Sequence, residues 1–421
     1  MASLNNGGPI IRRRDVCRLC HGRSLDLVLS LTATPLANSV VSAEQLDISE
    51  ACYPLDVHAC RGCGHVQLLD VIDPGVLFNH YVYTSGASPA YVAYLEEYAN
   101  GIISKLGLTT ESMVIEIGSN DGTLLAHFKK AGMKVLGVDP AENLSHLASE
   151  AGVETRTAFF TPNLAEEIKE DIGPVPLLIA NHVFAHADDL EGILEGVRLL
   201  LTPDGVFVFE VSYLLDVYRD VLFDTIYHEH LSYHTVGPLV EFFHRNDMEL
   251  IDVQRVQAQG GSLRGVVQLA GGPRTKESSV QQFVSAELRE IGEDLPAAFR
   301  LFEQRIDRER VRLTELLAGL RKEGSQISGY GAPAKATTLM YHFQLDASTL
   351  EYIVDDNPIK QGMLTPGLHV PIVSSDELAR RTPDFLLILA WNFAEPIMAA
   401  HRDFSEGGGK FIVPLPDVKV Y

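Results

Sequence analysis

Residues 113–128, with the sequence MVIEIGSNDGTLLAHF, constrain the fold more than any other stretch of this chain. They begin with a nearly continuous apolar run, as a parallel strand covered on both faces requires. Gly118 and Gly122 bracket a turn, after which Leu124, Leu125 and Phe128 recur at helical spacing. The stretch therefore predicts a buried strand, a glycine turn and a helix start, the unit from which α/β domains with parallel sheets are built.

The charge of this turn indicates which ligand it holds. A dinucleotide-binding turn has the form G-x-G-x-x-G and brings backbone amides to a pyrophosphate. Here Glu116 precedes the turn and Asp121 lies within it, and carboxylates suit a cationic ligand better than a pyrophosphate. The next predicted strand ends at Asp139, in a position to accept hydrogen bonds from ribose hydroxyls. These residues predict a site for S-adenosylmethionine (SAM); the alternative is an ordinary βαβ turn with a solvated Asp.

Length and charge narrow the class of protein. At 421 residues the chain should form two or three domains. Its formal net charge of −22 argues against nucleic acid as the main partner, although a local basic pocket stays open. No apolar run reaches transmembrane length, so no membrane association is expected. Residues 1–14 are polar and then basic, unlike a secretory signal, and a cytoplasmic protein is therefore expected.

Four of the five cysteines form two C-x-x-C pairs, Cys17 with Cys20 and Cys60 with Cys63. Each pair places two thiolates on one tight turn, and two such turns complete a tetrahedral Zn²⁺ site. A closed site with four protein ligands contributes to folding rather than to catalysis. The weaker alternative is a redox C-x-x-C, for which one pair would suffice. Cys52 stands in a short apolar stretch and is expected to be a buried thiol.

Candidates for ligand contact follow the apolar strand predicted at 177–180. Open α/β sheets bind ligands beyond the carboxyl ends of their strands, and this strand ends at Asn181 and His182, with His186 shortly after. Phe159, in a predicted third strand or loop, either stacks on adenine or belongs to the core.

Aromatic residues are dense just before the SAM-binding stretch. The linker 78–88 carries Tyr81 and Tyr83 beside the start of that domain, which makes both candidates for the site. The predicted helix 89–106 carries a stripe of apolar and tyrosine side chains on one side, which favours core packing over ligand contact.

The segment 225–234, TIYHEHLSYH, holds three histidines, two tyrosines and a glutamate, which is no core pattern. A metal site is one alternative, but the H-E-x-x-H spacing is absent and methyl transfer from SAM needs no metal. A solvated polar turn is another. We favour an active-site strip, because a nucleophile must lose a proton before it accepts a methyl group. Histidine has the pKa of a general base near neutrality, and a tyrosine hydroxyl can donate to a developing oxyanion.

The last part of the chain predicts a hairpin, a long helical stretch and a second nucleotide fold. Residues 248–257 and 260–267 should form two antiparallel strands, and 278–322 should be helical, split by Pro296. The stretch 327–335, ISGYGAPAK, reads as a strand followed by G-x-G-x-x-A and a lysine, which suits a diphosphate. The alternative is a structural turn with Lys335 solvated.

In this order the motifs resemble the nucleotide-sugar C-methyltransferases of deoxysugar biosynthesis, over nearly the whole length. The resemblance implies an α/β protein of three parts. These are a zinc-binding module at 1–75, a class I SAM-methyltransferase domain with a Rossmann-like fold at 76–275, and a helical linker with a second Rossmann-like domain at 276–421. The motifs that carry it are Cys17 to Cys63, Glu116 to Gly122, Asn181 to His186, Tyr227 to His230, Gly329 to Lys335 and Asp355 to Gly362.

The resemblance implies SAM-dependent methylation of the carbon next to the ketone of an NDP-4-keto-6-deoxysugar, with C-3 favoured over C-5. His230 would remove the proton alpha to the ketone, with Tyr227 and Glu229 assisting. His186 and Tyr83 would stabilise the enolate oxygen. The implied binding residues are Glu116, Gly118, Asn120, Asp121, Gly122, Asp139, Phe159, Asn181 and His182 for SAM, and Tyr81, Tyr330, Lys335, Asn357 and Lys360 for the nucleotide sugar.

Three other classes stay open at this point. One is an NAD-dependent nucleotide-sugar oxidoreductase that uses the turn at 329–334, which leaves the acidic turn at 116–122 unexplained. Another is a zinc-bearing RNA methyltransferase, which the acidic balance opposes. The third is a binding protein without turnover, against which the histidine and tyrosine strip argues. For the nucleotide-sugar C-methyltransferase, a monomer is expected.

Overall fold

The structure is a computed structural model that describes residues 10–421, in two compact units. Unit 1 comprises the chain up to Asp26 together with Ala59–Leu215 and Leu231–Glu293. Unit 2 comprises Leu27–His58, Asp216–His230 and Asp294–Tyr421. Residues 1–9, which belong to the expected zinc module and to the stretch unlike a secretory signal, lie outside the described residues.

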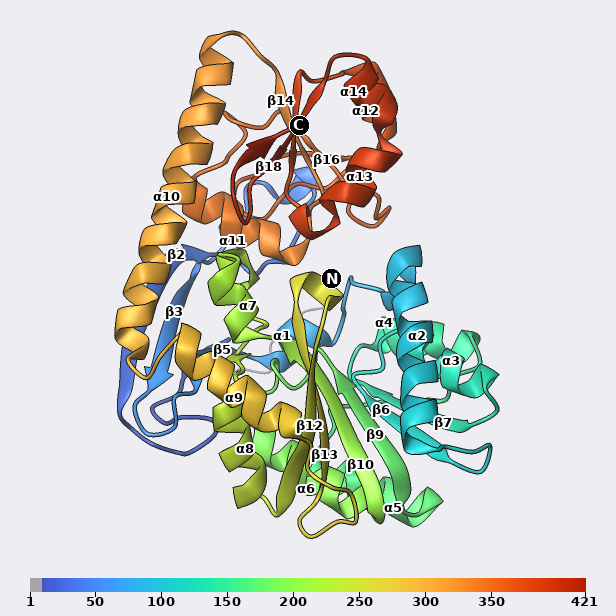
Figure 1. Cartoon of the computed structure of the whole chain (residues 1–421). Coiled ribbons are helices and arrows are strands. Elements are labelled where there is room, and N and C mark those ends of the chain that lie inside the picture. The colour runs from blue at the N-terminus through green and yellow to red at the C-terminus, as the bar shows by residue number, and fades with distance from the viewer. Residues whose placement is uncertain (1–9) are drawn as a thin grey trace. The chain divides into compact units, whose positions relative to one another are not determined.

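Unit 1 is built on a seven-stranded sheet with the order β12-β13-β10-β9-β6-β7-β8 (Figure 1). Strands β10, β9, β6, β7 and β8 are parallel, and β13 runs antiparallel to both β10 and β12. The hairpin expected after residue 248 is therefore confirmed. The strands are β6 (Met113–Ile117), β7 (Lys134–Asp139), β8 (Thr155–Thr157), β9 (Val175–Asn181), β10 (Leu201–Ser212), β12 (Met248–Val256) and β13 (Ser262–Leu269).

The strand order decides where this sheet can bind a ligand. From β6 the chain proceeds to β7 and β8 on one side, and it then returns to β9 and β10 on the other. The order thus reverses between β6 and β9, and open α/β sheets bind ligands at such a switch point, outside the carboxyl ends of the strands. The turn after Ile117 and the loop after Asn181 meet this condition.

Helices cover both faces of this sheet, as a parallel sheet requires. On one face α2 and α3 pack on the strands through Leu95, Tyr98, Ile102 and Phe128. The tyrosine stripe of α2 is thus largely core, as expected. Helix α2 begins where Ser88 accepts the Tyr91 N–H and ends at Gly107 with φ +64°. The helices are α1 (Pro74–Phe78), α2 (Pro89–Leu106), α3 (Thr123–Lys130), α4 (Glu142–Glu150), α5 (Pro162–Ile172), α6 (Leu190–Leu200), α8 (Val236–Arg245) and α9 (Ser278–Glu290).

The N-terminal part of unit 1 adds short strand pairs. Strand β1 (Ile11–Arg13) pairs antiparallel with β5 (Asp70–Ile72), and β4 (Val66–Leu68) pairs antiparallel with β11 (Ser232–Tyr233). Strand β11 lies within the expected active-site strip 225–234. Residues 231–233 are therefore held by β4, which follows the second cysteine pair in the chain. Two longer strands, β2 (Leu25–Thr34) and β3 (Tyr53–Cys60), and the helix α7 (Leu214–Arg219) run across unit boundaries in the chain.

Unit 2 contains a second α/β sheet with the order β16-β15-β14-β17-β18-β19, parallel except for β19. Its long helix α10 begins where Asp294 accepts the Ala297 N–H at 2.9 Å, with Pro296 in the first turn, so the expected break at this proline is a helix start. Its elements are α10 (Leu295–Lys322), β14 (Ile327–Tyr330), α11 (Ala334–Phe343), β15 (Ile353–Val354), β16 (Ile372–Val373), α12 (Asp376–Arg380), β17 (Phe385–Ile388), α13 (Ala394–Ala400), α14 (Arg402–Glu406), β18 (Lys410–Val413) and β19 (Lys419–Val420).

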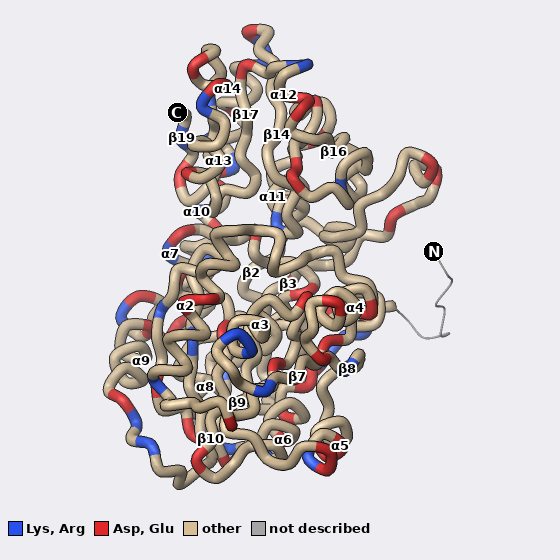
Figure 2. The backbone as a smooth tube through the Cα atoms, turned by 90° about the vertical axis from the view of Figure 1, so that its right-hand side faces the viewer, with Lys and Arg blue, Asp and Glu red and all other residues tan. Residues whose placement is uncertain are grey.

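Two expectations about exposure can be compared with the structure. The prediction that Cys52 is buried is wrong: its side chain is exposed, because the short apolar stretch around it lies in a loop. Within residues 10–421 no helix is both long enough and apolar enough to cross a bilayer. The acidic excess is spread over the helices of both units, for instance on α4, α5 and α12, as Figure 2 shows.

Candidate active site

The turn after β6 is shaped by glycines that no larger residue could replace. Gly118 has φ +69°, and a Cβ there would stand 2.2 Å from a methyl carbon of Val183. Gly122 has φ +78° at the start of α3. Asn120 between them is also left-handed, with φ +54°, a conformation that asparagine tolerates better than most residues. The turn therefore brings the backbone close to the loop after β9, at the switch point of the sheet.

Two carboxylates at this turn are buried. Asp139 accepts N–H groups of Asn120 and Ala141, both at 2.8 Å, and so ties the end of β7 to the turn. Glu116 is 4% exposed, and its Oε2 has no hydrogen-bond partner among the described residues. Burial, together with the charges of Asp139 and Asp121, raises the pKa of Glu116 well above its ordinary value. An orphaned buried carboxylate oxygen fits a cationic ligand with hydrogen-bond donors, such as SAM.

The linker before α2 is fastened to this turn. The Ser85 N–H donates to Asn120 Oδ1 at 2.9 Å, and the Gly86 N–H donates to Asp121 Oδ2 at 2.8 Å. The Asn120 side chain in turn donates to the carbonyl of Tyr83 at 3.1 Å. The backbone of Tyr81 exchanges hydrogen bonds with the Asn143 amide. The structure thus brings the linker tyrosines to the cofactor turn, although they precede it by more than thirty residues in sequence.

The loop after β9 carries three of the predicted residues. Tyr98 donates to Asn181 Oδ1 at 3.3 Å, and His182 has φ +55°. The His186 ring stacks on Phe78, with 5.8 Å between ring centroids and 6° between planes. Phe159 is 39% exposed, so it is not a core residue, and its contact with adenine stays a prediction.

A buried glutamate that sequence reasoning missed stands beside this loop. Glu210, near the end of β10, is 0% exposed and accepts the Tyr94 hydroxyl at 2.7 Å and Arg264 at 2.9 Å. Burial opposes its ionisation, but the hydrogen bond and charge of His182 and the charge of Arg264 outweigh it and lower the pKa of Glu210. The sequence signal was a lone glutamate in the apolar run 206–211, paired in register with Asn181.

In unit 2, the strip around His230 has a defined geometry. The Nδ1 of His230 lies 2.6 Å from the carbonyl oxygen of Thr225, which can only accept, so Nδ1 carries the proton. A neutral ring protonated there has its lone pair on Nε2, as a general base requires. The Tyr227 ring packs against this imidazole at 4.1 Å between centroids. Glu229 is buried and accepts the Asn38 amide at 2.7 Å.

The other two histidines of the strip are structural. His228 is 1% exposed, bonds the Tyr53 carbonyl at 3.2 Å, and burial lowers its pKa to about 4. His234, in unit 1, is fully buried; its Nε2 lies 3.3 Å from the Phe184 carbonyl, and burial lowers its pKa to about 4. Both stay neutral near pH 7. Of the three, only His230 combines partial exposure with an oriented ring.

The second glycine turn, after β14, has a different environment from the first. Ala332 donates its N–H to Asp355 Oδ2 at 2.6 Å, and the Tyr330 hydroxyl donates to Asp356 at 3.0 Å. Asn357 follows these acids and is half-buried. The Lys335 ammonium bonds Asn392 at 2.5 Å and lies 3.5 Å from the Trp391 ring centroid, and burial lowers its pKa to about 8. Lys360 is buried and donates to the Ala332 carbonyl at 2.7 Å.

The four paired cysteines meet in unit 1. Their sulfur atoms all lie within 4.8 Å of one another, with 3.7 Å between Cys17 and Cys63 and 3.4 Å between Cys20 and Cys60. Tetrahedral Zn–S bonds of about 2.3 Å place sulfur atoms about 3.8 Å apart, so the donor set fits Zn²⁺. Each knuckle is closed by a backbone bond, from His21 N–H to the Cys17 carbonyl and from Gly64 N–H to the Cys60 carbonyl.

The buried carboxyl group of Glu116 makes the stability of the folded chain depend on pH. Its pKa is raised in the folded state, so the folded chain binds this proton more tightly than the unfolded chain does. Its contribution to stability is thus lost as pH rises from about 4.3 through the folded pKa. Glu116→Gln should therefore raise the unfolding free energy of the SAM-free protein at pH 8.5, by on the order of 2 kcal/mol, and less at pH 5.5. It should weaken SAM binding at least about tenfold.

Chemical denaturation at the two pH values and calorimetric titration of SAM measure these effects. Glu111→Gln is the matched control, because the Glu111 side chain is 86% exposed and should show neither change. A Glu116→Gln protein that is less stable than the unsubstituted protein at pH 8.5 would show that the buried charge is compensated.

Family models match three consecutive parts of the chain. A model described as "Putative zinc binding domain" matches residues 17–78, a methyltransferase domain matches 91–253, and a C-methyltransferase C-terminal domain matches 257–416. The order is that of the cysteine cluster, the seven-stranded sheet and the second sheet. The protein is thus a SAM-dependent methyltransferase with a zinc-binding module. This excludes the alternative of an NAD-dependent oxidoreductase.

Comparison with characterised proteins narrows this class. C-methyltransferase NovU of Streptomyces niveus is 37% identical over 412 residues, which are 98% of this chain and 98% of that protein. The chain belongs to this family of C-methyltransferases. A mitochondrial ubiquinone biosynthesis O-methyltransferase of Bos taurus is 27% identical over 97 residues, 22% of this chain and 26% of that protein.

Solved methyltransferase structures resemble the chain only weakly. A Burkholderia thailandensis 1,6-didemethyltoxoflavin-N1-methyltransferase has a TM-score of 0.31 and 21% identity, and covers 42% of this chain and 78% of its own. The magnesium protoporphyrin IX methyltransferase of Synechocystis has a TM-score of 0.33 and 13% identity, and covers 42% of this chain and 82% of its own. At these scores the likeness carries no functional inference.

Proposed function

We propose that the chain methylates the carbon next to the ketone of an NDP-4-keto-6-deoxysugar, with C-3 as the favoured carbon. Membership of the C-methyltransferase family supports carbon as the acceptor atom. A carbon nucleophile must be generated from a C–H bond. A neighbouring ketone makes this possible near neutral pH, because the negative charge is delocalised onto oxygen. The substrate therefore needs a ketone, and the protein needs a base and donors for the oxyanion.

The observation that carries this proposal is the contact between Nδ1 of His230 and the carbonyl oxygen of Thr225. The Thr225 carbonyl oxygen lies 2.6 Å from Nδ1 and accepts its proton, so the neutral ring has its lone pair on Nε2, the atom that we assign as the base. The contact with the Tyr227 ring restrains rotation of the imidazole. Glu229, the residue before His230, accepts a hydrogen bond from the Asn38 amide, and this contact helps to fix the strip.

The proposed reaction begins at the carbon next to the ketone. The C–H bond next to the ketone breaks, its proton passes to Nε2 of His230, and the electron pair moves to the ketone oxygen. His186 and the Tyr83 hydroxyl donate hydrogen bonds to that oxygen. When bound, SAM supplies an electrophilic methyl group and leaves as a neutral thioether. The new carbon–carbon bond forms as the C=O bond is restored, and His230 then releases its proton to water.

For the nucleotide part, we propose the turn after β14 as the binding region. Helix α11 begins at Ala334, four residues after the end of β14 at Tyr330, and a helix N-terminus favours a phosphate group. The ammonium groups of Lys335 and Lys360 are held by Asn392 and by the Ala332 carbonyl. Binding a diphosphate through these lysines would exchange those contacts for phosphate oxygens. Tyr330 and Asn357 stand beside the turn.

The test is mass spectrometry of NDP-4-keto-6-deoxysugars with different bases, incubated with the protein in D₂O with and without SAM. We expect one added methyl with SAM, and uptake of one deuterium without SAM, because the base acts before methyl transfer. The matched control is the corresponding 4-hydroxy sugar, which should take up neither. ¹³C-methyl SAM and NMR of the product distinguish C-3 from C-5. Methylation of the 4-hydroxy sugar would contradict the proposal, because it needs no enolate.

A further inference from the structure

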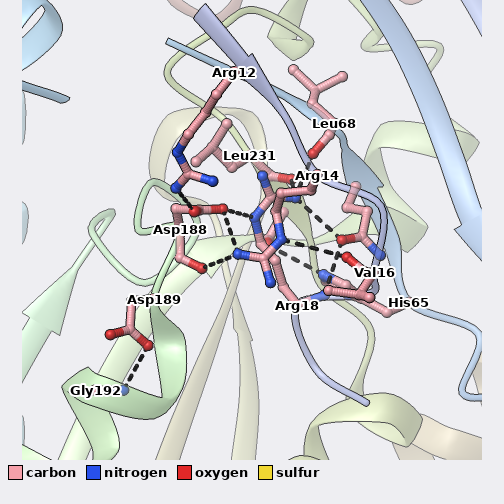
Figure 3. A network of polar contacts seen from close by, with 12 residues as sticks. Arg12, Arg14, Val16, Arg18, His65, Leu68, Asp188, Asp189, Gly192 and Leu231 are labelled. Atoms are coloured by element: carbon pink, nitrogen blue, oxygen red, sulfur yellow. Dashed lines mark hydrogen bonds and ion pairs between the residues drawn. The ribbon is translucent and has the colours of Figure 1, made fainter. Parts of the chain in front are cut away.

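A fully buried arginine lies inside the first cysteine knuckle. Arg18 stands between Cys17 and Cys20, and its side chain is 0% exposed. Its Nε donates to Asp188 Oδ1 at 2.9 Å, and its NH1 group donates to Gln67 Oε1 at 3.2 Å and to the carbonyls of Leu68 and Leu231. Arg12 and Arg14 also reach Asp188, and Figure 3 shows the three guanidinium groups turned toward this one carboxylate.

These contacts bracket His186. Asp188 follows it by two residues, and Ala185 precedes it. The Ala185 carbonyl accepts the N–H groups of Leu231, at 2.9 Å, and Ser232, at 3.0 Å. Leu231 accepts from Arg18 through its own carbonyl at 3.3 Å, and it follows His230 directly in the chain. One guanidinium therefore holds the segments next to His186 and next to His230.

Stability alone is a poor reason for such an arrangement. A buried ion pair contributes little net stability, because the cost of desolvating both charges offsets their attraction, and apolar replacements are often as stable. What a buried guanidinium provides is geometry, since its planar fork fixes several acceptors at set angles. Because its neighbours Cys17 and Cys20 are the sulfur ligands of the knuckle, Zn²⁺ bound there would fix the backbone of Arg18.

We propose that Arg18 is a positioning residue that transmits the order of the zinc knuckle, through Asp188 and Leu231, to the loop 181–188 and to the segment that follows His230. This inference rests on the proposed function for the catalytic role of His186, but the positional claim does not. The zinc site then serves methyl transfer through geometry, in addition to its role in folding.

The experiment compares Asp188→Asn with Asp189→Asn, the same chemical change one residue further on. Asp189 caps α6 by accepting the Gly192 N–H at 2.9 Å, a role that asparagine fills equally well, and Figure 3 shows it turned away from the arginines. Arg18→Lys is the second variant, which keeps the charge and loses the fork. We would measure the zinc content, the SAM affinity, and kcat and KM for the sugar substrate that the protein is found to methylate. Hydrogen–deuterium exchange would be measured for peptides that cover residues 182–188 and 231–234.

For Asp188→Asn and Arg18→Lys we expect full zinc content and KM within about threefold, with kcat lower by about tenfold to a hundredfold. Exchange should rise in both peptides, and Asp189→Asn should change nothing. Unchanged exchange and kcat in both variants would overturn the inference. So would an equal loss in Asp189→Asn, or a loss of zinc that accounts for the lower activity. If exchange rises in the two variants but the unsubstituted protein transfers no methyl group to any sugar, the proposed function is wrong. The inference that Arg18 positions these segments would still hold.

Discussion

His230→Asn should lower turnover by about three orders of magnitude and leave the Kd for SAM within about twofold. Asparagine can keep the hydrogen bond to the Thr225 carbonyl through its amide group. It has no lone pair that accepts a proton from carbon near neutral pH, so the enolate would not form. Single-turnover transfer from labelled SAM measures the rate, and calorimetric titration measures the affinity. Deuterium uptake by the sugar without SAM should disappear in parallel.

His228→Asn is the matched control, because it makes the same change two residues earlier. His228 is buried and neutral and bonds the Tyr53 carbonyl at 3.2 Å. Its replacement should lower the melting temperature by several degrees through loss of packing, while kcat of the folded protein stays within a few fold. If the His230→Asn protein keeps turnover within tenfold of the unsubstituted protein, then another residue is the base. Loss of SAM binding would instead assign the strip to the cofactor.

Cys60→Ser should release zinc and unfold the N-terminal part of unit 1. A serine hydroxyl is a poor Zn²⁺ ligand, and the apparent binding energy of a four-cysteine site, about 10–16 kcal/mol in small zinc domains, is largely folding energy. Cys60 ends β3, and its N–H donates to the His65 carbonyl at 2.9 Å, so the second knuckle should lose its order first. Metal analysis, circular dichroism and limited proteolysis measure the loss.

Cys52→Ser is the control for this substitution, since Cys52 is exposed and is not one of the four clustered sulfur atoms. It should keep one zinc per chain and full activity. If Arg18 positions the loop after β9, partial removal of zinc by a chelator should also raise exchange in residues 182–188 before the seven-stranded sheet unfolds. A soluble, zinc-free and fully active Cys60→Ser protein would falsify the structural assignment.

Much of the fold was predictable because it depends on neighbours in the sequence. The run at 113–117, Gly118 and the helix that follows form a strand, a turn and a helix start, and the structure has each of them. The helix at 89–106 has its capping serine, proline and glycine in the sequence itself. The cysteine pairs belong to the same class, since a C-x-x-C places its own two thiolates on one turn.

Partners and burial were decided only by the tertiary structure, because both depend on residues far away in the chain. Three histidines in one strip look alike in the sequence; the Tyr53 and Phe184 carbonyls and the core around them make two of these structural. Lys335 suits a phosphate by its position after the glycines, yet folding places its ammonium against Asn392 and Trp391.

The sequence by itself therefore determined the succession of strands and helices around the cofactor turn, the turn itself and the two cysteine pairs, since each rests on local spacing. Only the tertiary structure decided which polar groups are buried, oriented or paired: the orphaned oxygen of Glu116, the network around Glu210 and the guanidinium of Arg18. The physical reason is that desolvation and charge pairing are set by groups that folding brings within a few ångströms.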